Sequence, residues 1–412
     1  MGSFSFRSGN AAQVLRLPLH LAGALATRLI PRSRDRWVFG CATGIGEGAL
    51  ALWQQTDAAR ERRVWLVASD DEAAAAARLG IPTAPKAGLP GFWLTARARV
   101  VVVTHGAGDV NRYATGGAFL VQLWHGIPLK RLGLDSPATT RSPLPIPGFE
   151  RLLRLAYART QQRIRLIPAA SHLVRGRLES SFGLDDTRVP VTGEPRVDVL
   201  SAGTPAERRK RARAGIDAAV GPVGDRAVIL YAPTWRDGAD DPGVPNADEW
   251  ARIVDVLERT DAVLLIRSHP LGAGEYAPPV AAERVRLIGS DLVAEITPLL
   301  PGFDALVTDY SSLAFDSALV PLPVVYLAPD EDDYAASRGF YGRYRDVAGD
   351  DVAGDWTATA DQLRRLLTEP AERSRRIERA VALSSRVHAY RDGRNAERVY
   401  RAILAGATGG RP

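Results

Sequence analysis

The sequence predicts an α/β protein made of two Rossmann-like halves. Short apolar runs of β-prone residues alternate with amphipathic helical stretches along its 412 residues, which is the pattern of βαβ units with parallel sheets. A chain of this length has room for two such domains. Residues 201–225 are rich in Pro, Gly and charged side chains and interrupt the alternation, which is typical of a linker.

The first half contains apolar runs short enough for strands and longer stretches with apolar residues at helical spacing. The expected strands span residues 37–40, 64–68, 100–104, 119–123, 165–169 and 189–192, and the expected helices span 47–55, 72–78, 148–163 and 171–182. The second half repeats the pattern, with a charge-rich helix expected inside the linker. Its expected strands span 227–231, 262–266, 285–288, 305–308 and 323–326, and its expected helices span 248–258, 292–300, 313–318, 358–367, 371–384 and 394–405.

Residues 1–35 form a basic segment ahead of the first domain. The first 36 residues hold six arginines and one acid, Asp35, around an apolar stretch that Arg16, His20 and Arg28 interrupt. This stretch is too short and too charged to span a bilayer, which takes roughly 20 apolar residues. We expect an interfacial amphipathic helix that associates with a membrane, rather than a secretory signal.

The chain is basic, with a formal net charge of +6. Nucleic acid, an anionic membrane surface or a phosphorylated substrate would each explain this charge. No recognition helix, zinc finger or basic groove with interleaved aromatic residues is present, so we expect no nucleic-acid partner. The arginine clusters on predicted helices are either solvated helix faces or contacts with anionic lipid. The single cysteine, Cys41, excludes an intrachain disulfide and fits a reducing compartment.

Two histidines follow predicted strands in different halves of the chain. His125 comes after the run 119–123 and precedes Gly126, which permits a close approach of the backbone to a ligand. His269 follows the run 262–266. Ligands of open α/β sheets bind beyond the carboxyl ends of the strands, and an imidazole there suits general-base catalysis. The alternative is that each histidine is only structural or merely exposed.

The run 305–308 leads into Thr308-Asp-Tyr-Ser-Ser-Leu-Ala-Phe-Asp316, which is typical of a strand, a turn and a helix. Ser311 and Ser312 are expected at the helix N-terminus, where unpaired N–H groups and the helix dipole favour an anion. Two hydroxyls add donors, which suits a phosphate. The alternative is that one serine only caps the helix.

Several common motifs are absent from the sequence. It has no phosphate-binding P-loop, no G-x-S-x-G elbow and no Cys/His zinc spacing, and the glycine-rich stretch 40–46 is not a G-x-G-x-x-G fingerprint. The acidic pair Asp240-Asp241 is not expected to bind a metal. We therefore expect no metal site and no cofactor, and the sequence leaves a requirement for Mg²⁺ open.

Seven segments, in order, resemble the CDP-glycerol glycerophosphotransferases of teichoic acid and capsule polymer synthesis. Together they cover most of residues 100–400. They are Val121-Gln-Leu-Trp-His-Gly-Ile-Pro-Leu-Lys-Arg-Leu-Gly-Leu-Asp135, Val191-Thr-Gly-Glu-Pro-Arg-Val-Asp198, Tyr231-Ala-Pro-Thr-Trp-Arg236, Ile266-Arg-Ser-His-Pro270, Val307-Thr-Asp-Tyr-Ser-Ser-Leu-Ala-Phe-Asp316, the segment from Tyr334 to Arg345, and Asp392-Gly-Arg-Asn-Ala396.

The resemblance implies a GT-B architecture, in which two Rossmann-like domains face each other across a cleft. Residues 36–200 would form the acceptor domain, residues 226–390 the CDP-alditol-binding domain, and residues 391–412 a C-terminal helix and tail. The implied reaction moves glycerol phosphate from CDP-glycerol to a hydroxyl of a membrane-linked acceptor and releases CMP. The resemblance also implies peripheral, monotopic association with the cytoplasmic face of a bacterial cell membrane.

The resemblance also implies roles for individual residues. His125 and His269 are the expected catalytic residues, with His125 as the general base and His269 also a phosphate contact. The expected phosphate contacts further include Arg267, Thr308, Ser311 and Ser312. The nucleotide side of the cleft is expected to hold Thr234, Trp235 and Arg236. The remaining expected substrate-binding residues are Trp124, Gly126, Lys130, Asp135, Asp309 and Asp316.

Three alternatives stay open. The donor could be CDP-ribitol or another CDP-alditol, because the motifs do not distinguish one alditol from another. A GT-B glycosyltransferase would instead use a nucleotide sugar. A catalytically silent nucleotide-binding partner on the membrane is the third alternative, and the two histidines argue against it. The sequence leaves open the acceptor, single addition against polymerisation, and the oligomeric state.

Overall fold

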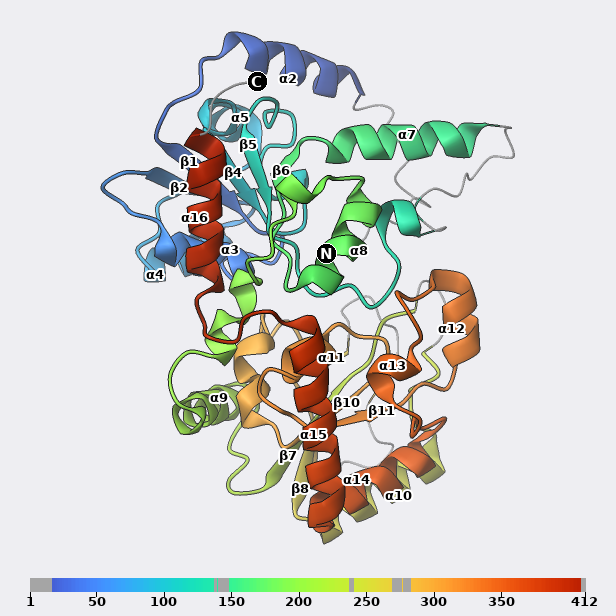
Figure 1. Cartoon of the computed structure of the whole chain (residues 1–412). Coiled ribbons are helices and arrows are strands. Elements are labelled where there is room, and N and C mark those ends of the chain that lie inside the picture. The colour runs from blue at the N-terminus through green and yellow to red at the C-terminus, as the bar shows by residue number, and fades with distance from the viewer. Residues whose placement is uncertain are drawn as a thin grey trace. The chain divides into compact units, whose positions relative to one another are not determined.

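The computed structural model describes residues 17–136, 139, 148–236, 241–268, 276 and 283–408. The chain forms two compact units (Figure 1). Unit 1 comprises Met1–His125, Leu132–Asp198 and Asp392–Pro412, and unit 2 comprises Gly126–Arg131 and Val199–Arg391. The short segment Gly126–Arg131 thus belongs to unit 2 although its sequence neighbours on both sides belong to unit 1.

Unit 1 contains a six-stranded sheet in the order β3-β2-β1-β4-β5-β6, with every neighbouring pair parallel. Its strands are β1 (Arg36–Gly40), β2 (Arg62–Val67), β3 (Thr83–Pro85), β4 (Val100–Val103), β5 (Phe119–Gln122) and β6 (Ile164–Leu166). The four consecutive valines of β4 are completely buried, as expected for a central strand covered on both faces. Its helices are α2 (Leu17–Leu29), α3 (Glu47–Gln55), α4 (Asp70–Arg78), α5 (Gly88–Arg97), α7 (Phe149–Gln161), α8 (His172–Phe182) and α16 (Asn395–Thr408).

The last helix of the chain completes the core of unit 1. Val399 and Ile403 of α16 are fully buried in the same apolar cluster as Trp37 of β1 and Leu52 of α3. Figure 1 shows α16, drawn in red, beside α3. The start of α16 is held by Asp198, whose carboxylate accepts the backbone N–H groups of Asn395 and Ala396. Residues about 350 positions apart therefore build one core.

The described part of the basic N-terminal segment packs onto unit 1. In α2, a Cβ added to Gly23 would lie only 2.4 Å from the carbonyl oxygen of Tyr113, so the two backbones are in close contact. After the helix, the Arg32 guanidinium donates to the carbonyls of Thr95 and Ala98. Removing all of residues 1–35 would therefore strip contacts from unit 1. Residues 1–16 lie outside the described part of the chain.

Unit 2 contains a five-stranded parallel sheet in the order β11-β10-β7-β8-β9. Its strands are β7 (Ala227–Ala232), β8 (Ala262–Ile266), β9 (Val285–Leu287), β10 (Ala305–Thr308) and β11 (Val324–Tyr326). Its helices are α9 (Pro205–Val220), α10 (Ala247–Arg259), α11 (Leu313–Ser317), α12 (Glu331–Arg338), α13 (Arg345–Ala348), α14 (Trp356–Thr368) and α15 (Pro370–Val387), with a 3-10 helix η5 at Thr297–Gly302. Two of the helices begin with a capping box, in which two side chains each accept a backbone N–H of the other residue. The pairs are Thr204 with Glu207 at α9 and Asn246 with Glu249 at α10.

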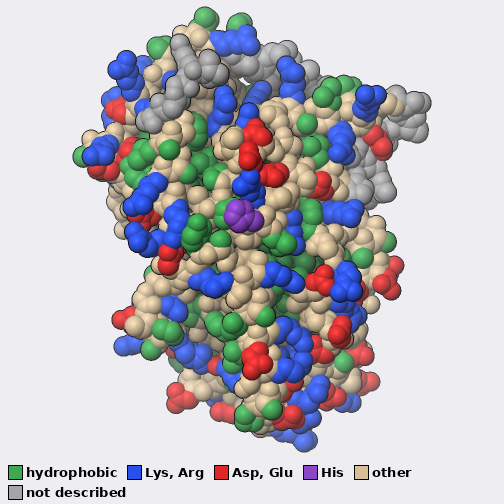
Figure 2. Space-filling view, viewed as in Figure 1, with side chains coloured by type: hydrophobic (Ala, Val, Ile, Leu, Met, Phe, Trp, Pro, Cys, Tyr) green, Lys and Arg blue, Asp and Glu red, His purple; other side chains and the backbone are tan. Residues whose placement is uncertain are grey.

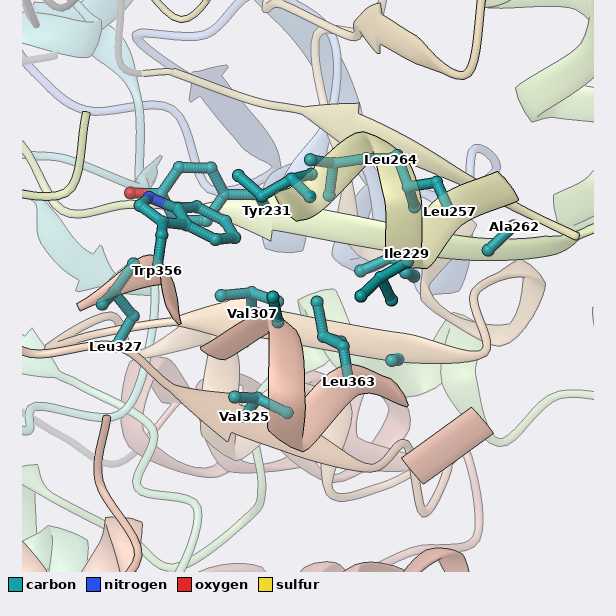
Figure 3. Packing of buried hydrophobic residues seen from close by; sticks show 14 of the residues in the cluster. Ile229, Tyr231, Leu257, Ala262, Leu264, Val307, Val325, Leu327, Trp356 and Leu363 are labelled. Carbon is teal, nitrogen blue, oxygen red and sulfur yellow. The ribbon is translucent and has the colours of Figure 1, made fainter. Parts of the chain in front are cut away.

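The core of unit 2 packs α10 and α14 against one face of this sheet (Figure 3). Ile229, Leu264 and Val307 come from three strands, and Leu363 comes from α14. At one end of the cluster, the rings of Tyr231 and Trp356 meet edge to face with centroids 4.8 Å apart. Both rings donate a hydrogen bond to the carbonyl of Gly243, which satisfies their polar atoms inside the core.

The two parallel sheets confirm the predicted α/β class, but several elements differ from the prediction. The stretch 292–300 contains no α-helix and instead leads into η5, because Pro298 and Pro301 cannot donate the backbone hydrogen bonds of a regular helix. The predicted strand 189–192 is reduced to one bridge between Ala169 and Val191, next to Pro190. The elements β3, α5, α12 and α13 were not predicted.

Both strand orders contain a switch point. There, the connections from two adjacent strands lead to the next strands in opposite directions along the sheet. In unit 1 it lies between β1 and β4, and in unit 2 between β7 and β10. Open α/β sheets bind ligands in the crevice at the carboxyl ends of the strands beside such a point. We therefore expect a ligand site at the residues that follow β1 and β4 in unit 1, and at those that follow β7 and β10 in unit 2.

Candidate functional site

In unit 1, His125 lies three residues beyond the end of β5 and is exposed. Its ring is stacked on that of His105, with centroids 4.5 Å apart and planes at 16°, and it also contacts the Trp124 ring at 4.3 Å. Trp124 in turn packs edge to face on Phe182 of α8 at 5.1 Å. The predicted histidine is thus held by aromatic rings on an edge where ligands bind.

The backbone on both sides of this ring is in an unusual conformation. Trp124 has φ 64°, a left-handed value that costs a residue with a large side chain on the order of 1–3 kcal/mol. The next residue but one, Gly126, has φ 144°, which a glycine adopts without a steric penalty. These angles turn the chain sharply at His125, and such strain is common at functional sites.

His105 is held in place by the loop after β4. The buried carboxylate of Asp109 accepts the backbone N–H of Thr104 at 2.8 Å and that of His105 at 2.7 Å, so the loop folds back onto its own strand. Burial lowers the pKa of His105 to about 4, so the ring is neutral at neutral pH. A neutral ring stacks on His125 without charge repulsion.

In unit 2, Asp309 joins the two loops at the switch point. Its carboxylate accepts the backbone N–H of Thr234, after β7, at 2.9 Å and that of Tyr310, after β10, at 2.6 Å. Arg236 donates to the other carboxylate oxygen at 2.9 Å. Asp309 is 3% exposed. Two of the residues predicted to bind substrate are therefore a buried ion pair that shapes the loops.

Arg236 also reaches α12. It donates to both carboxylate oxygens of Asp330 and lies over the rings of Tyr310 and Tyr334, about 5 Å from each centroid. Burial by itself would lower the pKa of Arg236, but its hydrogen bonds to Asp330 and the charge of Asp309 raise this pKa above the ordinary value. The guanidinium is permanently charged and fully engaged with protein groups.

Arg236 forms a cluster with Asp309, Asp330, Tyr310 and Tyr334, which we call the unit 2 cluster. Lys130, from the segment Gly126–Arg131, is a second cation of this cluster. The segment pairs with α12 and the turn after it through a bridge between Lys130 and Phe340, and the Lys130 Nζ lies 5.9 Å from the centroid of the Tyr334 ring. Lys130 has no carboxylate partner within salt-bridge distance among the residues that the structure describes. Burial lowers the pKa of Lys130 to about 8, which nearby Asp309 partly counteracts.

The two serines after β10 have different environments. The Ser311 hydroxyl accepts the backbone N–H of Leu313 at 3.2 Å, as a local turn does. Ser312 occupies the N-cap position of α11, but its side chain makes no capping hydrogen bond. The alternative that Ser312 is only a helix cap therefore finds no support in its contacts.

Three further predicted contacts are engaged with the fold. Arg267 donates to the carbonyls of Ile288 and Val293, at 3.1 and 2.8 Å. The buried Thr308 hydroxyl donates to the carbonyl of Ala232 at 2.7 Å, which ties β10 to β7. Asp316 is buried on α11. A role in phosphate binding remains a prediction for Arg267 and Thr308, and a role in substrate binding remains one for Asp316.

The other predicted site residues are dispersed. Asp135 lies on a short 3-10 helix of unit 1 and accepts a hydrogen bond from the Ser180 hydroxyl of α8 at 2.6 Å. Trp235 is half-buried in the loop between Thr234 and Arg236. His269 lies outside the described residues.

Sequence reasoning gave no role to three members of the unit 2 cluster, Asp330, Tyr310 and Tyr334. Tyr310 donates to Asp330 at 2.9 Å and stacks on Tyr334 with centroids 4.0 Å apart. The family-like segments included the two tyrosines, but only the fold shows that they surround Arg236. Hollows of about 350 and 450 Å³ flank α12, and four consecutive acids from Asp330 to Asp333 line the larger one, which disfavours a diphosphate there.

Several proteins with sequences similar to this chain are enzymes of teichoic acid synthesis. A teichoic acid poly(glycerol phosphate) polymerase of Staphylococcus epidermidis is 30% identical over 54% of this chain and 30% of its own length. A teichoic acid glycerol-phosphate transferase of Staphylococcus aureus is 26% identical over 69% of this chain and 70% of its own. A teichoic acid poly(ribitol-phosphate) polymerase of Bacillus spizizenii is 27% identical, over 70% and 43%. The chain thus spans less than half of two of these relatives.

The fold is similar to that of the wall teichoic acid polymerase TagF, with a TM-score of 0.74 and 21% identity over 96% of this chain and 95% of that structure. This likeness confirms the predicted GT-B class. The family described as CDP-Glycerol:Poly(glycerophosphate) glycerophosphotransferase matches residues 45–405. The chain therefore belongs to the CDP-glycerol:poly(glycerophosphate) glycerophosphotransferase family.

Proposed function

We propose that this protein transfers glycerol phosphate from CDP-glycerol to a hydroxyl group of a membrane-linked acceptor and releases CMP. The observation that carries the proposal is the exposed His125 ring, which stacks on His105 at the carboxyl edge of a Rossmann-like sheet. Membership of the glycerophosphotransferase family supports it. A solved TagF structure that was soaked with CDPG supports the choice of donor.

His125 would act as the general base. The acceptor oxygen forms a bond to the glycerol-bearing phosphorus, the phosphoanhydride P–O bond breaks, and CMP leaves with its electron pair. The hydroxyl proton passes to the imidazole. Proton removal by a positioned base contributes roughly 10²–10⁴ in rate, and the rest of such a transfer relies on position and charge.

Unit 2 would hold the donor diphosphate. Two cations, Arg236 and Lys130, and two carboxylates, Asp309 and Asp330, form its charged centre, so these four charges cancel. The backbone N–H groups and hydroxyls of Ser311 and Ser312 would then supply the remaining donors to the anion. Lys130 is the member of the centre whose charge is not paired in a salt bridge, so it is the one most available to phosphate oxygens.

CDP-ribitol is the second candidate donor, because one of the relatives is a poly(ribitol-phosphate) polymerase at an identity close to that of the glycerol-phosphate enzymes. Purified protein offered CDP-glycerol, CDP-ribitol or a nucleotide sugar, with a polyol-phosphate acceptor, distinguishes the candidates. We expect CMP release with CDP-glycerol to exceed that with CDP-ribitol. Release of a nucleoside diphosphate from a nucleotide sugar, with no CMP from either CDP-alditol, would contradict the proposed reaction.

Replacing His125 by alanine is expected to reduce turnover by about 10²–10⁴-fold, because the acceptor proton loses its base. Binding of CDP-glycerol, measured by calorimetry, should stay nearly unchanged. The control is His172→Ala, which removes an exposed histidine at the start of α8 in the same unit. Turnover of His125→Ala within threefold of the unchanged protein would exclude the role as base.

Lys130→Met is expected to weaken CDP-glycerol binding by roughly tenfold to a hundredfold, as the loss of a charge-assisted hydrogen bond of about 1.5–3 kcal/mol implies. In the unchanged protein, affinity should also fall as pH rises through about 8, because Lys130, which faces Asp309, Arg236 and Arg338, then loses its proton. Calorimetry across pH measures both effects. The matched control is Lys210→Met, an exposed lysine of α9. Equal affinities of Lys130→Met and the control would remove Lys130 from the phosphate site.

We propose further that the protein works as a peripheral protein at the cytoplasmic face of the membrane. No helix among the described residues is long and apolar enough to cross a bilayer. Two helices of unit 1 combine exposed leucines with arginines, α2 with Leu25 and Leu29 and α7 with Leu152 and Leu155. On the face drawn in Figure 2, basic side chains are spread among acidic ones. Exposed leucines beside arginines suit insertion at the membrane interface.

Changing both Leu152 and Leu155 to Glu is expected to reduce sedimentation with anionic vesicles by several-fold, because two apolar anchors become charged. The side chains are 59% and 65% exposed, so the fold should tolerate the change. The control is Leu292→Glu, an exposed leucine of unit 2 at 52%. If the double variant pellets as well as the control does, α7 is not the anchor.

A further inference from the structure

The carboxyl ends of β1 and β4 bring together three side chains of the kinds that bind transition metals. Cys41 follows β1, Glu47 begins α3, and His105 follows β4. One ligand atom from each lies within 4.8 Å of the others, and the Cys41 Sγ is 3.8 Å from the nearer Glu47 oxygen. The three residues meet at the switch point of unit 1, which is where a Rossmann-like sheet binds its ligands.

The cluster contains polar and conformational features that the described protein contacts do not account for. The Nδ1 atom of His105 is buried and makes no hydrogen bond within the described part of the chain. Leaving a buried polar atom without a partner destabilises a fold. Glu47 has φ 53°, a left-handed value that is uncommon for any residue but glycine and that a surrounding structure must enforce. A bound ligand would give both features a purpose.

We propose that Cys41, Glu47 and His105 bind a zinc ion. A thiolate, a carboxylate and an imidazole form a mixed set that suits Zn²⁺, whereas Mg²⁺ and Ca²⁺ prefer oxygen atoms alone. On binding, the Cys41 thiol releases its proton to solvent as the Zn–S bond forms. Three protein ligands leave the fourth tetrahedral position open to a water molecule or to an oxygen of a ligand.

The distances fit after a small movement. Zinc bonds of about 2.3 Å to sulfur and about 2.0–2.2 Å to nitrogen and oxygen place tetrahedral ligand atoms roughly 3.3–3.6 Å apart. The contact between Cys41 and Glu47 is already close to this separation, and the widest gap in the cluster needs a shift of roughly 1 Å. Rotation of the Glu47 side chain, which is only half-buried, can supply such a shift.

The zinc ion would position His125. The His105 ring is both a proposed ligand and the surface on which the His125 ring is stacked, at 4.5 Å between centroids. A metal bond would fix the rotation of the His105 ring, and with it the orientation of the exposed imidazole above. This proposal departs from the expectation, drawn from the sequence, that the chain needs no metal.

The test is made on the full chain, stripped with a chelator and then supplied with Zn²⁺ or Co²⁺. Elemental analysis after gel filtration should find roughly one zinc per chain, and the cobalt form should show a thiolate-to-metal charge-transfer band, since Cys41 is the only cysteine. Glu47→Gln and His105→Gln should each weaken zinc binding on the order of tenfold or more, and Cys41→Ser should abolish the cobalt band. Circular dichroism establishes that each variant is folded.

His172→Ala is the control, because this histidine is exposed on α8 of the same unit. The proposal is overturned if the unchanged chain binds no zinc above background, if the Cys41→Ser variant keeps the cobalt band, or if the control loses as much zinc as His105→Gln, which would indicate adventitious binding by surface groups. These readouts do not depend on transferase activity. A protein that binds zinc as expected but transfers no alditol phosphate would therefore contradict the proposed function and leave the metal site intact.

Discussion

The strand order of the two sheets is the constraint on which the rest of the structure depends. Crossovers between parallel strands are right-handed, so a sheet that grows in both directions from its first strand sends successive helices to opposite faces. The segments that follow β1 and β4, or β7 and β10, then diverge and leave the carboxyl ends of those strands uncovered. The proposed zinc ligands and the loops joined by Asp309 all lie at these two places.

The two switch points are built from different chemistry. In unit 1 the neutral imidazole of His105 is stacked on that of His125, beside the Cys41 thiol and the Glu47 carboxylate, and such a surface suits proton transfer. In unit 2 a buried ion pair of Arg236 and Asp309 is surrounded by tyrosines. The desolvation of such a pair offsets much of its attraction, so its contribution is to fix the geometry of the loops rather than to raise stability.

The class of fold and the ends of the central strands could be predicted from the sequence because β4, β7, β8 and β10 are continuous apolar runs. The weaker elements could not. The helix α5 contains Gly88, Pro90 and Gly91, which are poor helix formers, although Gly91 is required because an added Cβ would lie 2.3 Å from the carbonyl oxygen of Lys86.

Some of the candidate site residues could likewise be predicted from the sequence, and others could not. His125, Asp309 and the two serines follow strong strands, so they could be placed by counting along the chain. The Cys41, Glu47 and His105 cluster has no recognisable ligand spacing, and the contacts of Asp330 and Tyr310 with their partners depend on tertiary packing that no local pattern records.

The return of α16 to unit 1 has a consequence for biosynthesis. Val399 and Ile403 are synthesised long after Trp37, yet they complete the core to which Trp37 belongs. Unit 1 therefore cannot mature during translation as an independent N-terminal domain. Its hydrophobic face must wait, exposed or chaperone-bound, until α16 has been synthesised.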